Sequence, residues 1–370
     1  KEQNLKLAGL DPGLLLEGAT PRLIDEWQLA PSLWDAVRFE VDQRDAFNQF
    51  ILTGSATPAA DMSKSHSGTG RIARMIMRPM SLFESEDSNG TVSLEQLFAN
   101  QQEVSARVDL DLRHIAYLIC RGGWPKALGY SERIALRQAY DYYDAVVESD
   151  ISNTDGVSRN SQRVRLLMRS YARFISSDAK LTSIRADMAN NDADALSTDT
   201  IYAYINALKG IFVIEDMPAW SPRLRSATTI RTSDTRHFVD PSIAVAALGI
   251  GPDDLLRDLN TMGLLFESMC IRDLRIYAEA LGGMVSHYRD KSGLECDAVV
   301  HLRNGSYGLV EVKLGGDDIE MAAKNLNTLS EKIDLNRMPS PSFMMIMTGT
   351  SYAYRREDGI YVIPAGCLRV

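Results

Sequence analysis

The sequence has few cysteines, and their spacing serves no obvious chemistry. Four occur in 370 residues, without any C-x-x-C pair: Cys120, Cys270, Cys296 and Cys367. This scatter argues against a zinc motif or a disulfide framework and is typical of buried thiols in a reducing cytosol. The chain also lacks an apolar run of about 20 residues, which a membrane-spanning helix needs. We therefore expect a cytoplasmic protein without a membrane segment.

An excess of positive charge is also missing. The formal net charge is −9, so the chain as a whole lacks the basic footprint of many nucleic-acid-binding proteins. A nucleic-acid site would have to be local. The length suffices for two or three domains with a substantial core.

What the sequence does contain is a strand–helix–strand pattern between Pro21 and Ser55. Its first apolar run ends in Asp25 and Glu26, and its second ends in Thr53-Gly54-Ser55. The carboxyl ends of parallel strands meet at one edge of a sheet, where ligands bind. In a P-loop ATPase, Asp25 would hold Mg²⁺ and Glu26 would polarise the attacking water, with Thr53 or Ser55 sensing the γ-phosphate. The alternative is that the two carboxylates only cap a helix.

Four sequence blocks carry a family resemblance: RLIDEWQ (22–28), LTGS (52–55), HSGTGR (66–71) and MRPMSLFE (77–84). They resemble the AAA-like predicted ATPases of bacteria and archaea whose C-terminal half is a domain of unknown function (DUF4143). The resemblance implies an α/β P-loop ATPase core, a helical lid, a winged helix and a nuclease-like C-terminal domain. It implies ATP and Mg²⁺ as cofactors and Arg71 as an arginine-finger candidate, the alternative being a solvated basic loop.

The sequence departs from this family at the phosphate-binding loop. It contains no G-x-x-x-x-G-K-[ST] and no Gly-Lys pair. We expect the first strand, P-loop and helix of the ATPase domain to be absent, a piece of about 30 residues or more. ATP binding by this chain should therefore be weak or absent, because nothing else replaces that backbone cradle and its lysine.

We divide the chain into four predicted parts. Residues 1–85 are the remaining portion of the ATPase domain, and 86–150 are a helical lid or linker. Residues 151–250 are a winged helix, and 255–370 are a restriction-endonuclease-like αβββαβ domain.

The predicted winged helix is locally basic. Between Arg159 and Arg236 there are twelve Lys and Arg against eight Asp and Glu, a net of 12 − 8 = +4. Helices are predicted at 163–176, 181–188 and from 197, followed by short strands at 212–214 and 237–239. The candidate phosphate contacts are Arg163, Arg165, Arg169, Arg173, Arg223 and Arg225. Docking to a protein partner is the alternative use of such a module.

The C-terminal part contains a candidate metal site. A three-residue hairpin loop, Arg303-Asn304-Gly305, would pair Leu302 with Ser306 and so Asp297 with Glu311. A two-residue loop would place these two carboxylates on opposite faces, so the prediction depends on the turn.

Asp297, the Glu311-Val312-Lys313 triplet and a helical Glu267 resemble the PD-(D/E)XK nuclease superfamily. The resemblance implies Mg²⁺ ligation by Asp297 and Glu311, an outer carboxylate at Glu267, and a water-orienting Lys313. The alternative is a surface cluster of carboxylates and a lysine.

Three functions therefore remain open. The first is an ATPase that couples ATP turnover to an event on nucleic acid or on a partner protein. The second is a Mg²⁺-dependent nuclease, and the third is a non-catalytic DNA- or protein-binding module. The sequence gives no indication of the oligomeric state.

Overall fold

The computed structural model describes residues 2–56, 70–100, 103–151, 157, 159–190, 196–221 and 233–370. The chain forms two compact units. The first comprises Lys1–Met77 with Ser149–Arg159 and Asn206–Phe212, and the second comprises Arg78–Glu148, Asn160–Ile205 and Val213–Val370. Arg223 and Arg225 lie outside the described residues.

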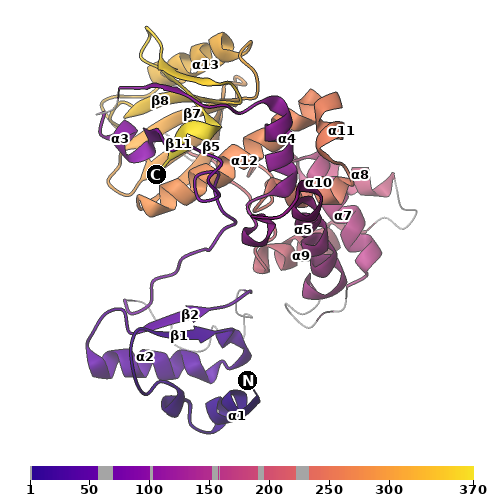
Figure 1. The fold of residues 1–370 in the computed structure, drawn as a ribbon, viewed down its shortest axis with the longest axis vertical. Coiled ribbons are helices and arrows are strands. Elements are labelled where there is room, and N and C mark those ends of the chain that lie inside the picture. The colour runs from indigo at the N-terminus through magenta and orange to yellow at the C-terminus, as the bar shows by residue number, and fades with distance from the viewer. Residues whose placement is uncertain are drawn as a thin grey trace. The chain divides into compact units, whose positions relative to one another are not determined.

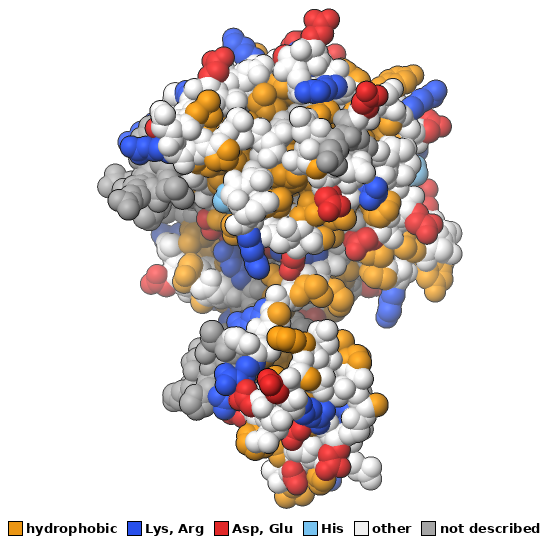
Figure 2. Space-filling model, turned by 90° about the vertical axis from the view of Figure 1, so that its left-hand side faces the viewer, with side chains coloured by type: hydrophobic (Ala, Val, Ile, Leu, Met, Phe, Trp, Pro, Cys, Tyr) orange, Lys and Arg blue, Asp and Glu red, His pale blue; other side chains and the backbone are white. Residues whose placement is uncertain are grey.

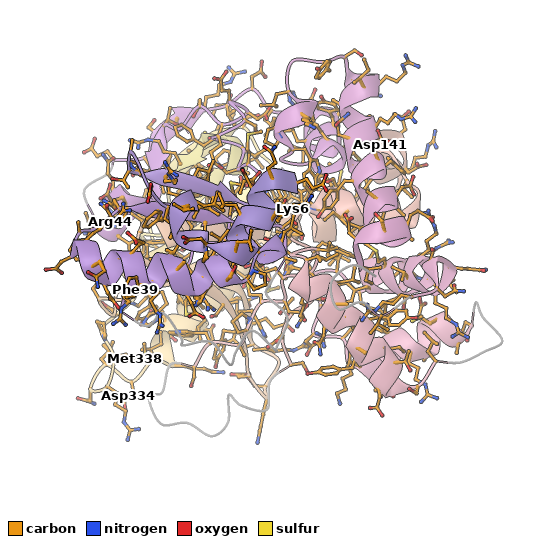
Figure 3. The ribbon with its side chains drawn as sticks, turned by 90° about the horizontal axis from the view of Figure 1, so that it is seen from below. Lys6, Phe39, Arg44, Asp141, Asp334 and Met338 are labelled. Carbon is orange, nitrogen blue, oxygen red and sulfur yellow. The ribbon has the colours of Figure 1, made fainter. Side chains whose placement is uncertain are left out.

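The first unit is built on two parallel strands. Its N-terminal elements are α1 (Glu2–Leu10), η1 (Pro12–Leu15), β1 (Arg22–Asp25), η2 (Trp27–Leu29), α2 (Ser32–Arg44) and β2 (Phe50–Thr53). The register runs from Arg22 opposite Phe50 to Asp25 opposite Thr53, which confirms the predicted strand–helix–strand unit. The core beneath one sheet face contains Ala8, Leu16, Ala30, Leu33 and Val37. Figure 3 shows Phe39 and Arg44 on α2.

The second unit begins with a helical part. Its helices are α4 (Leu112–Arg121), α5 (Glu132–Ala145), α7 (Ser161–Arg173), α8 (Leu181–Ala189), α9 (Thr198–Gly210, which runs into the first unit), α10 (Pro241–Leu248) and α11 (Pro252–Arg257). The apolar side chains of α7 fall at helical spacing, and Val164, Leu167, Met168 and Tyr171 are buried. Among the described helices none is long and apolar enough to cross a membrane.

A seven-stranded mixed sheet forms the rest of the second unit, in the order β4-β9-β10-β8-β7-β6-β5. Its strands are β4 (Ser105–Arg107), β5 (Gly283–Arg289), β6 (Glu295–Leu302), β7 (Tyr307–Lys313), β8 (Phe343–Thr348), β9 (Tyr352–Arg355) and β10 (Tyr361–Pro364). The helices α12 (Leu259–Ala280) and α13 (Ile319–Glu331) cover its two faces (Figure 1). The order α12–β5–β6–β7–α13–β8 agrees with the predicted αβββαβ arrangement.

The predicted helical lid or linker, 86–150, is not helical throughout. Its first part forms β3 (Val92–Ser93) and a short α3 (Leu94–Phe98). The strand β3 pairs with β11 (Leu368–Arg369), and β4 pairs with β9 as an edge strand of the large sheet. Strands of two to four residues are too short to show the period-two pattern of a strand. Their pairing partners also lie in the C-terminal part of the chain, so no local pattern indicates them.

A buried ionic network joins α12 to the N-terminal end of α10. Arg272 donates to Asp240 at 2.9 Å and to Asp273 at 2.7 Å, and all three side chains are almost fully buried. Asp240 also accepts from the Gly123 N–H, and Asp273 accepts from the Leu82 N–H. The Gly122-Gly123-Trp124-Pro125 turn and the segment after residue 78 are thereby fixed to the second unit.

Candidate functional sites

The first candidate site is the carboxyl edge of β1 and β2. The Thr53 hydroxyl donates to Asp25 Oδ1 at 2.8 Å, and the Ser55 hydroxyl donates to Glu26 Oε2 at 3.2 Å. Gln28 also donates to Glu26 through its side-chain amide. The structure therefore brings together three of the predicted residues, Asp25, Glu26 and Thr53, and it adds Gln28, which sequence reasoning missed.

The backbone at Glu26 is unusual. Its φ of +53° and ψ of +45° place a non-glycine residue in the left-handed region, directly after β1 ends. Such conformations cost about 1–3 kcal/mol, persist only where surrounding structure holds them and cluster at functional sites. The Glu26 side chain makes no capping hydrogen bond to the following helical turn. The helix-cap interpretation therefore does not account for Glu26.

The donor set of this edge suits a hydrated Mg²⁺ ion. Two carboxylates and two hydroxyls supply hard oxygen atoms, and Mg²⁺ keeps most of its waters while binding one or two carboxylates. The phosphates of a nucleotide are not provided for in the same way, because the 370 residues contain no Walker A motif. The residues thus fit the metal part of Mg-ATP and leave the phosphate cradle without an equivalent.

The arginines of the 71–78 segment have different partners. Arg71 pairs with Asp42 of α2, and this contact raises the pKa of the guanidinium. Arg78 is largely buried and pairs with Glu215 at 2.6 Å and with Glu279, so it is a structural residue of the second unit. Arg71 remains the arginine of this segment that is predicted to act on phosphate.

The second candidate site lies where β6 and β7 separate. Ala298 pairs with Val310 and His301 with Tyr307, and the Leu302 N–H donates to the Ser306 carbonyl, which confirms the predicted hairpin register. Gly305 has a φ of +89°, as the three-residue loop requires.

A β-bulge interrupts the pairing of β6 with β5 at Asp297. On the β5 side, Ser286 pairs with Val299 but Tyr288 pairs with Cys296, so two β6 residues oppose one residue of β5. The Val312 N–H then donates to Asp297 Oδ2 at 2.8 Å rather than to a strand carbonyl. Asp297 is thus one of the two bulge residues, and its carboxylate contacts β7; bulges can re-aim a side chain in this way.

Lys313 bridges the two carboxylates. Its Nζ lies 3.1 Å from Asp297 Oδ2 and 2.8 Å from Glu311 Oε2. The Glu311 side chain is 2 % exposed and that of Lys313 is 25 % exposed, so the ammonium lies on the more open side. The structure therefore assembles the Asp and Glu-x-Lys residues that the sequence singles out.

Burial and like charge set the proton affinities here. Burial raises the pKa of Glu311 to about 8, with the Asp297 charge adding to the rise and Lys313 opposing it. Burial also raises the pKa of Glu267, and the charge of Asp297 adds to this increase. The pKa of Lys313 is raised by the two carboxylates against the opposing effect of burial. Glu311 and Glu267 therefore hold their protons more tightly than ordinary carboxyl groups do.

The residues of the β6–β7 site fit a metal ion only in part. Within the described ranges, no three His, Cys, Asp or Glu residues form a group arranged to hold a metal ion. However, Glu311 Oε1 is buried and has no hydrogen-bond partner among the described residues. Such an atom is costly to bury unless a cation or donor satisfies it. Asp297 and Glu311 could hold Mg²⁺ only if Lys313 moved aside, with Glu267 as the outer carboxylate.

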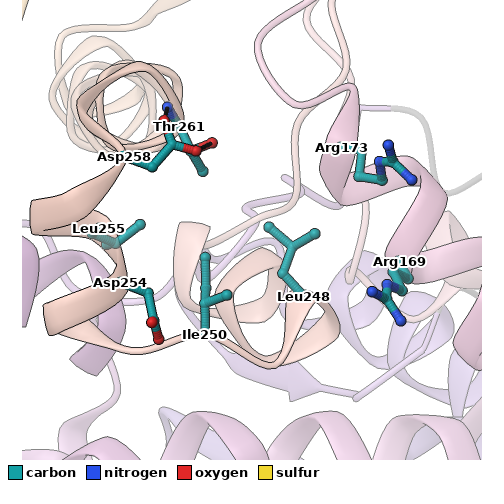
Figure 4. A pocket seen from close by; sticks show the side chains of 8 residues that line it. All are labelled: Arg169, Arg173, Leu248, Ile250, Asp254, Leu255, Asp258 and Thr261. Atoms are coloured by element: carbon teal, nitrogen blue, oxygen red, sulfur yellow. Dashed lines mark hydrogen bonds between the residues drawn. The ribbon is translucent and has the colours of Figure 1, made fainter.

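The arginines of α7 do not form a single basic surface. Arg165 pairs with Asp144 and Glu148, and Arg173 pairs with Asp187. Arg169 and Arg173 line a cavity of about 410 Å³, and Asp254 and Asp258 lie across it (Figure 4). On the face shown in Figure 2, basic and acidic side chains are interspersed. Phosphate contact by Arg163, Arg165, Arg169 and Arg173 stays a prediction.

The winged-helix prediction also stays open. The helices α7, α8 and α9 follow one another as predicted. The expected wing strands are represented by two isolated antiparallel bridges, Ile214 with Phe238 and Met217 with Thr235. Residues 222–232 between them lie outside the described part of the chain, so the wing itself is not defined.

Comparison with known families assigns both ends of the chain. Residues 2–86 match the AAA domain family, and residues 262–368 match a domain of unknown function, DUF4143. Residues 112–254 match a second domain of unknown function, DUF8612. No curated protein matches the chain. The two terminal matches confirm the predicted resemblance to AAA-like ATPases that carry DUF4143.

Proposed function

We propose that the β1–β2 edge is the hydrolytic half of an ATPase site. The premise is that this chain is an AAA-domain protein with a C-terminal DUF4143 domain. The observation that carries the proposal is the convergence of Asp25, Glu26 and Thr53 in one parallel register. ATP turnover would drive an event on nucleic acid or on a protein partner. The cofactors are ATP and Mg²⁺.

Each residue has a separate task in this proposal. Asp25 holds the metal through water, and Thr53 fixes one Asp25 oxygen, leaving the other for that contact. Glu26 accepts a proton from, or orients, the attacking water, and Gln28 and Ser55 hold its carboxylate by hydrogen bonds. Bound Mg²⁺ supplies charge neutralisation at the phosphates. Arg71 would stabilise the charge of the transferring phosphoryl group.

The test is a Glu26→Gln substitution in a chain supplied with a Walker A segment. We expect ATP hydrolysis to fall at least tenfold while nucleotide binding persists, because positioned proton transfer contributes about 10²–10⁴-fold. Steady-state phosphate release and equilibrium binding of a labelled ATP analogue are the two measurements. Glu17→Gln is the control, an exposed carboxyl in the same unit. An unchanged rate in Glu26→Gln would contradict the proposal.

The second candidate function is Mg²⁺-dependent cleavage of a phosphodiester at the β6–β7 site. Its supporting observation is the Asp297–Lys313–Glu311 cluster at the bulge, with the buried Glu311 Oε1 unpartnered among the described residues. Lys313 would orient water and offset the charge that develops on the phosphate, while Asp297 and Glu311 would hold the metal. The metal ion supplies Lewis-acid polarisation of the phosphate.

Lys313→Met tests this second function. We expect cleavage of plasmid and single-stranded DNA in Mg²⁺ or Mn²⁺ to be lost, since charge stabilisation by one such group accounts for about 10²–10³-fold. Lys332→Met is the matched control, because Lys332 also pairs with an aspartate but lies 45 % exposed on another part of the unit. If neither the parent protein nor its variants cut either substrate, the site is not a nuclease.

A further inference from the structure

The two-stranded edge of the large sheet carries an exposed aromatic surface. In β9, Tyr352 is 59 % exposed and Tyr354 is 40 % exposed, while Ala353 between them is buried. In β4, Arg107 pairs with Tyr352 and Ser105 pairs with Tyr354, and both β4 residues are exposed. Because paired residues point to the same side, two tyrosines and an arginine share one outward face.

The cations of this edge are available to an anionic ligand. The Arg107 guanidinium lies over the Tyr352 ring at 5.8 Å, and that of Arg355 lies over the Tyr361 ring at 5.2 Å. Neither arginine forms an ion pair among the described residues. By contrast, the neighbouring Arg356 is occupied by Glu320 at 2.6 Å and by Asp358 at 3.2 Å. Those two carboxylates are therefore neutralised locally.

The sheet register relates this edge to the β6–β7 site. Tyr354 pairs with Val362, which pairs with Ile346, which pairs with Glu311. One row of the sheet thus runs from the tyrosine to the buried carboxylate across three strand spacings, about 14 Å at ~4.8 Å each.

We propose that the outward face of the β4–β9 ribbon binds unpaired bases of single-stranded nucleic acid by stacking on Tyr352 and Tyr354. Base–aromatic stacking is tolerant of sequence, and it needs rings that are exposed and backed by a sheet. Arg107, which lies on the same face, contacts the backbone beside this platform. The binding itself is independent of the proposed phosphodiester cleavage. The claim that the bound nucleic acid is a substrate rests on that proposed function.

The chemistry favours stacking over phosphate contact as the main interaction. Among the described residues of β4 and β9, only Arg107 shares the face of the two tyrosines, in a chain whose net charge is −9. Each neutralised phosphate of a single strand contributes a slope of about −0.7 in log K against log salt, so one contact by Arg107 gives roughly that value. A binding surface made chiefly of arginines and lysines would show a much steeper dependence.

The experiment is fluorescence anisotropy of a labelled oligothymidylate with the full chain at 50 and 200 mM salt. We expect Tyr352→Ala and Tyr354→Ala each to weaken binding about 5- to 100-fold. Tyr352→Phe should retain binding, because stacking needs the ring and not the hydroxyl. Tyr130→Ala is the matched control, since Tyr130 is 62 % exposed elsewhere in the same unit.

Two outcomes overturn the proposal: both alanine variants binding as tightly as the parent chain, or duplex DNA competing as well as the single strand. Lys313→Met separates the two hypotheses. Tyrosine-dependent binding that persists without any cleavage supports the platform and contradicts the nuclease. Cleavage that needs Lys313 but not the tyrosines supports the nuclease and contradicts the claim that the strand bound by the tyrosines is its substrate.

Discussion

Replacing Arg272 by Met should destabilise the second unit by about 3–5 kcal/mol. Arg272 is 2 % exposed and donates to Asp240 and Asp273, which are 0 % and 2 % exposed. Methionine fills similar space but leaves two carboxylates in the interior without a cation. Removing one partner of a buried ion cluster is strongly destabilising because the remaining charge stays desolvated. Urea denaturation followed by circular dichroism measures the loss.

Arg165→Met is the control for this prediction. Arg165 also pairs with two carboxylates, Asp144 at 2.9 Å and Glu148 at 2.8 Å, but its side chain is 40 % exposed. We expect a loss below about 1 kcal/mol, because solvent screens exposed pairs. Adding Asp273→Asn to Arg272→Met should recover part of the stability by removing one uncompensated charge. Equal losses in Arg165→Met and Arg272→Met would show that burial does not govern this network.

The separation of two residues along the sequence decides whether their contact could be predicted from the sequence. The hairpin of β6 and β7 was predictable because its register depends on a local turn, Arg303-Asn304-Gly305. The bulge at Asp297 was not, because it arises from pairing with β5 on the other side of the strand. The pairing of Arg78 with Glu215 and Glu279 spans 137 and 201 residues, and no local pattern encodes it.

The candidate sites show the same division. The acidic pair at the end of β1 and the hydroxyl at the end of β2 were predicted, because strand alternation and short connections fix where strands end. The left-handed Glu26 was not, because backbone strain is imposed by surrounding packing. The tyrosines of β9 were overlooked, although their alternation with Ala353 and Arg355 is a period-two signal. That signal was too short to identify a strand without its partners β4 and β10.

Glu311→Gln should stabilise the protein at high pH and leave it unchanged at low pH. Burial raises the folded-state pKa of Glu311 to about 8 from an ordinary 4.5, so the folded protein holds this proton more tightly than the unfolded chain. The free energy of unfolding of the parent protein therefore decreases as pH rises from about 4.5 to 8. Glutamine cannot ionise, so the variant should gain about 1–3 kcal/mol at pH 9 and nothing near pH 4. Urea denaturation at both pH values measures this difference.

The comparison also tests why such a carboxylate occupies the core. Glu295→Gln is the control on the neighbouring strand β6, because Glu295 is 49 % exposed and pairs with Arg289 at 3.1 Å; we expect no matching gain in stability at pH 9. At pH 8, Mg²⁺ should stabilise the parent protein and not Glu311→Gln, since an ion that binds only the folded state adds RT ln(1 + [L]/Kd). If the free energies of unfolding of the parent and of Glu311→Gln changed in parallel from pH 4 to 9, Glu311 would not be the group with the raised pKa. A metal site requires that Mg²⁺ stabilise the parent protein and not Glu311→Gln, whereas a merely structural cluster would show the same pH dependence without any effect of Mg²⁺.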